Sequence, residues 1–104
     1  MNTDFAFQAS DGLIRMSGDL DLSTRRQAFE ACYNCTGLDV ELDLSELTFM
    51  DSRGYASIID AADVLQSEGR TLTISGIQGE PLRLLTLIGA PVNATLLHRQ
   101  PIEV

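Results

Sequence analysis

Tryptophan is absent from this chain of 104 residues, and basic side chains are scarce. Lysine and arginine together number 7 against 15 aspartates and glutamates, so the formal net charge is -8. Nucleic acids and anionic membrane surfaces attract proteins through basic patches, and this balance therefore disfavours both as partners. It favours solubility and a protein partner with a basic face.

Long apolar runs and targeting signals are also missing. No stretch approaches the ~20 apolar residues that a membrane-spanning helix needs. The start of the chain, Met1 to Phe7, lacks the basic beginning and apolar middle of a signal peptide. We therefore expect a cytoplasmic protein without membrane insertion. Repeats, low-complexity segments and linkers are absent too, and the length suits one core, so we expect a single domain over residues 1–104.

Soft metal ligands are few, because the chain has two cysteines and one histidine. The pair from Cys32 to Cys35 has the C-x-x-C spacing of a redox motif or of half a zinc site. A structural zinc site usually takes four ligands, and only His98 could join the pair. A redox pair would open a helix after a strand, whereas this pair closes a predicted helix. We therefore expect no metal or cofactor, one or both cysteines buried, and His98 in a structural or solvent-exposed position.

Hydrophobic periodicity divides the chain into alternating strands and helices. Alternating apolar residues predict strands over 5–9, 13–17, 40–44 and 71–75, with a tight turn at Asp11-Gly12. A turn-rich link over 18–24 ends in good helix-capping residues. Helical spacing predicts helices over 25–33, from Gly54 to 65 and over 79–88, with apolar stripes at 55, 58, 59, 62 and 65 and at 82, 85 and 88. The tail, 92–104, is expected to hold a short strand or turn.

The resulting order, β-β-α-β-α-β-α, predicts an α/β domain. We expect a mixed, mostly parallel central sheet of four to five strands with helices packed against it, and an antiparallel opening hairpin. Functional groups in such sheets gather where strands end and helices begin. Two corners of that kind, 18–24 and 51–54, could lie side by side at one end of the sheet.

The corner from Asp51 to Gly54 places a hydroxyl at a helix start, where unpaired backbone N–H groups favour an anion. Ser52 could therefore cap the helix, act as a nucleophile or accept a phosphate. Asp51 and Ser52 are both ordinary capping residues, and Gly54 could permit close packing of helix against sheet. A nucleophile needs a base, and only His98 is available, so we do not expect an enzyme.

Two motifs in the chain resemble those of the STAS domain, which is found in bacterial anti-sigma factor antagonists. Gly18-Asp-Leu-Asp21, followed by a serine or threonine, is similar to the family's Gly-Glu/Asp-Leu-Asp loop. The stretch from Leu42 to Gly54 is similar to the signature in which Asp-Leu-Ser is followed, several residues later, by Met/Ile-Asp-Ser-Ser/Thr-Gly. The resemblance extends from the first strand to about Ala90 and implies a STAS-like fold.

The resemblance also implies a partner-switching role in transcription regulation. In that scheme the unphosphorylated antagonist binds an anti-sigma factor, which frees the sigma factor. The anti-sigma factor is also a serine kinase that phosphorylates the antagonist and so releases it, and a serine phosphatase reverses this step. By position the phosphoserine is Ser52. The sequence leaves the oligomeric state open, with a homodimer as one alternative. The residues expected to bind the partner are Asp21, Ser23, Asp51, Ser52, Arg53, Gly54 and Tyr55.

The chain departs from the family pattern beside the acceptor. Arg53 stands at the usual second serine or threonine, and Tyr55 at the usual leucine after the glycine. An arginine there could pair with the phosphate, change which kinase fits, or mark a chain without a phosphorylation cycle. The alternative function is therefore a STAS docking subunit of another assembly, such as a lipid-transport ABC complex or a stress-signalling scaffold.

Overall fold

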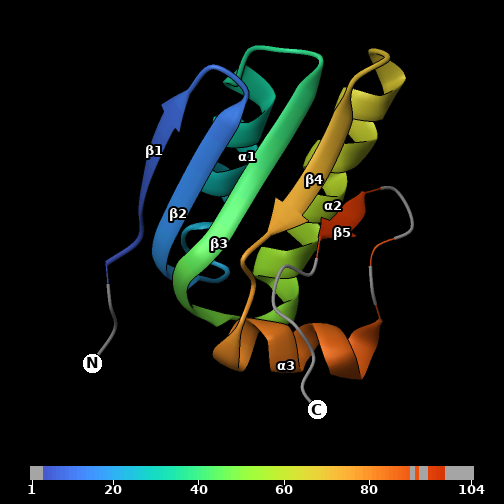
Figure 1. Ribbon diagram of the computed structural model, residues 1–104. Helices are drawn as coiled ribbons and strands as arrows, with labels where there is room; N and C mark the ends of the chain where they lie inside the picture. Colours follow the sequence, from blue (N-terminus) through green and yellow to red (C-terminus); the bar gives the residue numbers. More distant parts are fainter. Residues whose placement is uncertain (1–3, 90, 92–93, 98–104) are drawn as a thin grey trace.

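The computed structural model describes residues 4–89, 91 and 94–97, and its elements alternate as the sequence predicts (Figure 1). In chain order they are β1 (Ala6–Ser10), β2 (Leu13–Leu20), α1 (Arg25–Asn34), β3 (Asp39–Met50), α2 (Ser52–Ser67), β4 (Thr71–Ser75), α3 (Gly79–Ile88) and β5 (Thr95–Leu97). No helix within these residues is long and apolar enough to cross a membrane.

The strands form one five-stranded sheet in the order β1-β2-β3-β4-β5. β1 pairs antiparallel with β2, and the other neighbours pair in parallel. α1 and α2 lie side by side on one face of the sheet, and α3 lies at the end where β3 finishes (Figure 1). The predicted class, a mostly parallel α/β sheet with an antiparallel opening hairpin, is confirmed.

The core lies between the sheet and the helices α1 and α2. Val40, Leu42 and Leu44 of β3 are buried, whereas Glu41 and Asp43 between them are only half-buried. A strand sends successive side chains to opposite faces, so this alternation places apolar residues under the helices and polar residues on the other face. The stripe on α2 is buried at Tyr55, Ile58, Ala62 and Leu65 and half-buried at Ile59, as its helical spacing predicts.

Two strands are longer than the sequence indicates. β2 continues through Gly18 to Leu20, which the sequence assigns to a turn-rich link, and β3 continues to Met50 instead of ending at Leu44. The pairing of β2 with β3 has two register shifts, after which Leu20 lies opposite Met50. Burial alternates without a break along β2, so its end is missed because Gly18 and Asp19 are typical turn residues. In β3 the alternation itself is lost, as irregularities of this kind cause. Beyond Leu44 the buried residues follow at intervals of three, a spacing that does not identify a strand.

Two details of the helices also differ from expectation. The stripe on α3 is buried at Leu85 and half-buried at Leu82, but Ile88 in the last turn is 49% exposed. Thr24 is the N-cap of α1, yet its side chain makes no capping hydrogen bond. Its hydroxyl instead donates to the backbone oxygen of Asp19 at 2.9 Å, because the preceding loop folds back on the end of β2. The short strand expected in the tail is present as β5.

Candidate functional site

The two strand-to-helix corners meet at one end of the sheet. Leu20 and Met50, the last residues of β2 and β3, are register partners, and the backbone N–H of Asp51 donates to the Leu20 oxygen at 3.2 Å. Because β2 and β3 are parallel, α1 and α2 both turn back from this end and run in the same direction (Figure 1). The amino ends of both helices therefore form one surface, as the sequence predicts.

Gly54 allows α2 to approach the end of β2 this closely. A Cβ atom at this position would lie 2.3 Å from the backbone oxygen of Leu20 and 2.8 Å from its Cγ, distances that a side chain cannot adopt. The φ angle of Gly54 is not positive, so glycine is needed here for space and not for conformation. The expected close packing of helix against sheet is confirmed.

The roles of Asp51 and Ser52 separate at the start of α2. Asp51 is the N-cap in an extended conformation, and its Oδ1 accepts from the Gly54 N–H at 2.8 Å. Ser52 is the first helical residue and is exposed, and its hydroxyl makes no hydrogen bond to any described residue. The helix is therefore capped by the aspartate, which leaves the serine hydroxyl available at a helix amino end.

Asp21 organises the neighbouring loop. Its Oδ1 accepts from the backbone N–H of Ser23 at 3.0 Å, from the Ser23 hydroxyl at 2.8 Å and from the Thr24 hydroxyl at 3.3 Å. These bonds, the Ser23 hydroxyl bond first, hold the pKa of Asp21 below its usual range because they stabilise the carboxylate. Asp21 thus makes the turn with one oxygen, and its Oδ2 faces no hydrogen-bond donor among the described residues.

Two of the residues expected to bind the partner, Gly54 and Tyr55, are buried in this structure. Gly54 is buried against Leu20, and Tyr55 is only 8% exposed. The Tyr55 hydroxyl donates to the backbone oxygen of Gly89 at 3.2 Å, and burial raises the pKa of this phenol. Tyr55 faces inward because it belongs to the apolar stripe of α2, and Gly54 faces the end of β2, so both residues position the helix.

Arg53 is exposed, and it lies in a groove with two arginines that do not belong to the motifs. It lines a groove of about 380 Å³ between α1 and α2, together with Arg25 and Arg26 at the start of α1. The sequence carries a signal for them, since they are two adjacent basic residues at a predicted helix start in a chain with a net charge of -8. That signal identifies the residues but not their proximity to Arg53, which depends on the packing of the two helices.

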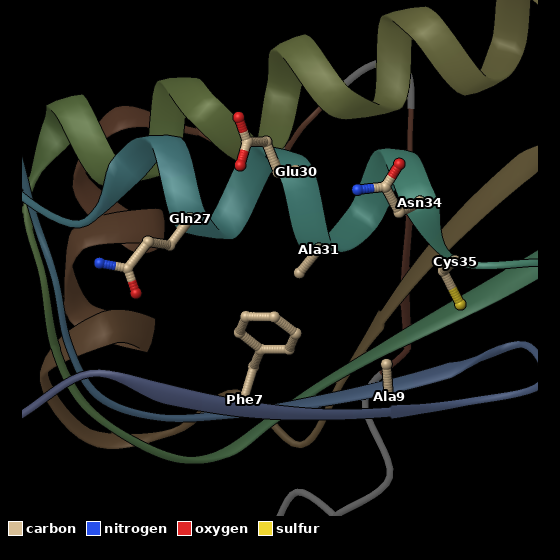
Figure 2. A pocket seen from close by; sticks show the side chains of 7 residues that line it. All are labelled: Phe7, Ala9, Gln27, Glu30, Ala31, Asn34 and Cys35. Atoms are coloured by element: carbon tan, nitrogen blue, oxygen red, sulfur yellow. The ribbon is translucent and has the colours of Figure 1, made fainter.

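The cysteine pair lies away from this surface, at the carboxyl end of α1. Cys32 and Cys35 are both buried, as expected. They are not bonded to each other, and burial raises the pKa of Cys32 to about 12. Figure 2 shows Cys35 at one end of a groove below α1, with Phe7 and Ala9 of β1 pointing into it. No metal-binding cluster of cysteine, histidine or carboxylate side chains occurs in the part of the chain that the structure describes, and His98 lies outside it.

The fold and the site together define a small α/β domain with an exposed serine at the start of its second helix, and comparison with known proteins identifies its family. The sequence model of the family described as "Mlab, STAS domain" matches residues 3–97. The chain therefore belongs to the STAS domain family.

Two solved structures share this fold. One is the anti-sigma factor antagonist SpoIIAA in its unphosphorylated form, with 14% identity and a TM-score of 0.60 over 93% of this chain and 90% of that one. The other is a candidate anti-sigma factor antagonist from Thermotoga maritima, with 14% identity and a TM-score of 0.64 over 92% of this chain and 86% of that one. At this identity the likeness establishes the common fold.

Proposed function

We propose that this protein is a cytoplasmic anti-sigma factor antagonist of a bacterial partner-switching pathway. It binds an anti-sigma factor that is also a serine kinase, and phosphorylation of Ser52 weakens that complex. The domain itself acts by binding and not by catalysis. A serine phosphatase would restore the binding form, and a homodimer is a further possible assembly.

The observation that carries the proposal is the state of the Ser52 hydroxyl. It is exposed at the first position of α2, while Asp51 provides the cap through its 2.8 Å bond to Gly54. A kinase can therefore reach the hydroxyl without disrupting the helix. In the reaction the Ser52 oxygen would form a bond to the γ-phosphorus of ATP while the bond to ADP breaks, and the hydroxyl proton would pass to a base on the kinase.

Phosphorylation at this position should change binding and leave the fold intact. A phosphate adds a charge of about -1.5 to -2 at neutral pH. The amino end of α2 stabilises that charge, since its first backbone N–H groups are unpaired and the helix dipole is positive there. A partner that contacts Ser52 would meet both steric bulk and new negative charge. A change of ~1.4 kcal/mol in binding free energy is tenfold in affinity, so a local effect suffices for release.

The residues around Ser52 form a surface that carries both negative and positive charge. Asp21 presents its Oδ2, Ser23 is exposed beside it, and Arg53 follows Ser52 on α2. A partner that fits must therefore carry a cation opposite the loop and an anion opposite Arg53. Asp51 contributes indirectly, because its side chain holds the helix start that presents Ser52.

The test is phosphorylation by a purified anti-sigma factor kinase encoded in the same genome. We expect ATP and this kinase to place one phosphoryl group on Ser52, mapped by mass spectrometry. Ser52→Ala should abolish the modification, and Ser67→Ala, at the other exposed end of α2, should not. The absence of phosphate on Ser52 with every such kinase would overturn the proposed switch.

A second candidate is a STAS docking subunit of another assembly, such as a lipid-transport ABC complex, without a phosphorylation cycle. Two observations favour it. Arg53 replaces the family's usual serine or threonine, and the matching family model bears the MlaB name. Purification of the tagged protein from its native cells would separate the candidates. Recovery of an ATP-binding anti-sigma kinase supports the first, and recovery of a transporter ATPase supports the second.

A further inference from the structure

The groove between α1 and α2 is locally basic on a strongly acidic protein. Its lining includes Arg25, Arg26 and Arg53, together with the half-buried Phe29 and the exposed Ala56. All seven basic residues of the chain are arginines, and three of them meet in this groove although the net charge is -8.

These three arginines have no ion-pair partners among the described residues. By contrast, Arg15 pairs with Asp43 at 3.0 Å, and Arg70 pairs with Glu68 at 3.2 Å. Glu30 and Asp60 also line the groove, but neither lies within ion-pair distance of an arginine. Both acids sit further along their helices than the arginines do, so the positive charge gathers at the amino-terminal mouth of the groove.

The arginines occupy positions that do not favour helix stability. Arg25 and Arg26 are the first two residues of α1, Arg53 is the second residue of α2, and neither helix has an acid in its first turn. A cation at a helix amino end is opposed by the helix dipole, where an acid would be stabilising. Residues that lower the stability of their own helix are expected at functional sites. The charges of these three arginines are therefore better explained by binding than by stability.

We propose that this groove binds an acidic segment of a partner protein. Guanidinium groups bind carboxylates through paired hydrogen bonds, and Arg25, Arg26 and Arg53 could each take one. An apolar side chain of the segment would lie against Phe29 and Ala56. Arginine and aromatic side chains are also the residue types that carry much of the binding energy in protein interfaces.

The groove gives Ser52 a second way to control binding, and this step rests on the proposed function. Ser52 lies one helical turn before Ala56 on the same face of α2, and it is adjacent in sequence to Arg53. A phosphate there would pair with Arg53 and neutralise the mouth of the groove. The acidic segment would then lose its counter-charge at the same time as it meets a phosphate.

The test uses the intact protein and a synthetic probe, so it does not depend on the identity of the partner. The ¹⁵N-labelled protein is titrated with a short peptide of alternating glutamate and leucine, and amide shifts are followed by NMR at low and high salt. We expect the amide chemical shifts of the groove residues to change until the peptide saturates the groove. The affinity should be lower at high salt, because salt screens the charges. The double variant Arg25→Gln/Arg26→Gln should lower the affinity by about 2- to 30-fold, the effect of removing two exposed ion pairs.

Matched variants separate charge from shape and from folding. Arg83→Gln removes an exposed arginine of α3 and should leave the affinity unchanged. The Arg25→Lys/Arg26→Lys variant should bind the peptide more tightly than the glutamine variant and less tightly than the wild type, because lysine keeps the charge but not the paired hydrogen bonds. The thermal midpoint of the glutamine variant should be unchanged or slightly raised, because it removes unfavourable charges from a helix start. Ser52→Asp should lower the affinity for the peptide. Gln66→Glu adds the same charge at the other end of α2 and should leave the affinity unchanged.

Several results would overturn the inference. These are shifts confined to another surface, equal affinity for a glutamine-leucine peptide, equal affinity of the glutamine variant, and no binding of the acidic peptide. Tight binding of inorganic phosphate without binding of the peptide would also overturn it and assign the groove to a small anion. None of these results bears on whether a kinase modifies Ser52, so a failure here is distinct from a failure of the proposed function.

Discussion

Replacing Gly54 by alanine sets two physical effects of opposite sign against each other. Gly54 lies inside α2, where alanine is favoured over glycine by about 1 kcal/mol. Its φ angle is not positive, so alanine meets no conformational penalty. Helix propensity alone therefore predicts that Gly54→Ala stabilises the protein. The packing of α2 against β2 predicts the reverse.

The magnitude follows from the contact with Leu20. The new Cβ would lie 2.3 Å from the Leu20 backbone oxygen and 2.8 Å from its carbonyl carbon. The obstructing atoms belong to backbone at the end of a central strand, and the 3.2 Å bond from Asp51 ties them to the helix start. Overpacking costs about 1 to 3 kcal/mol and occasionally more, and this site belongs at the upper end because backbone cannot rotate away. After the gain in propensity we expect a net loss of about 2 kcal/mol.

Thermal and urea unfolding followed by circular dichroism would measure this loss. A loss of about 2 kcal/mol corresponds to a thermal midpoint lower by roughly 10 °C in a domain of this size. Ala56→Gly is the control, because Ala56 is exposed in the same helix and its replacement measures helix propensity without packing. This variant should lose about 1 kcal/mol of stability. A Gly54→Ala protein as stable as the wild type, or more so, would show that α2 does not approach β2 in this way.

Three further predictions concern the same surface and the cysteine pair. Asp51→Ala should cost about 1 kcal/mol in urea unfolding by removing the cap of α2, and Asp51→Asn, a good cap, should cost little. Because burial raises the pKa of Cys32 to about 12, iodoacetamide at pH 8 should alkylate it only on unfolding, and fast labelling of the native protein would contradict this. The pKa of Asp21 is lower in the folded state, so its stabilising contribution is present above the unfolded pKa and is lost as pH falls through the folded one. Ser23→Ala should raise that pKa toward 3.8 in an NMR titration, and an unchanged value would contradict the hydrogen bond.

Local patterns predict most of the elements but not the ends of the two central strands. The alternation at Val40, Leu42 and Leu44 reveals β3, because each buried side chain faces the same helices. The extension to Met50 is hidden, since register shifts against β2 change which residues face inward. Ile88 carries the spacing of a buried stripe, yet the residue is 49% exposed, because spacing within one helix does not show how far the packing partner extends.

The sequence by itself determined the order of elements, the pairing class of the sheet and the corner at which Ser52 stands. These follow from hydrophobic periodicity and from a motif whose residues are adjacent in the chain. Only the tertiary structure decided that Asp51 is the cap and Ser52 is exposed, because capping depends on the backbone angles at which a helix begins. It also decided that Arg25 and Arg26 meet Arg53, because residues of two different helices come together only when both helices pack on one sheet.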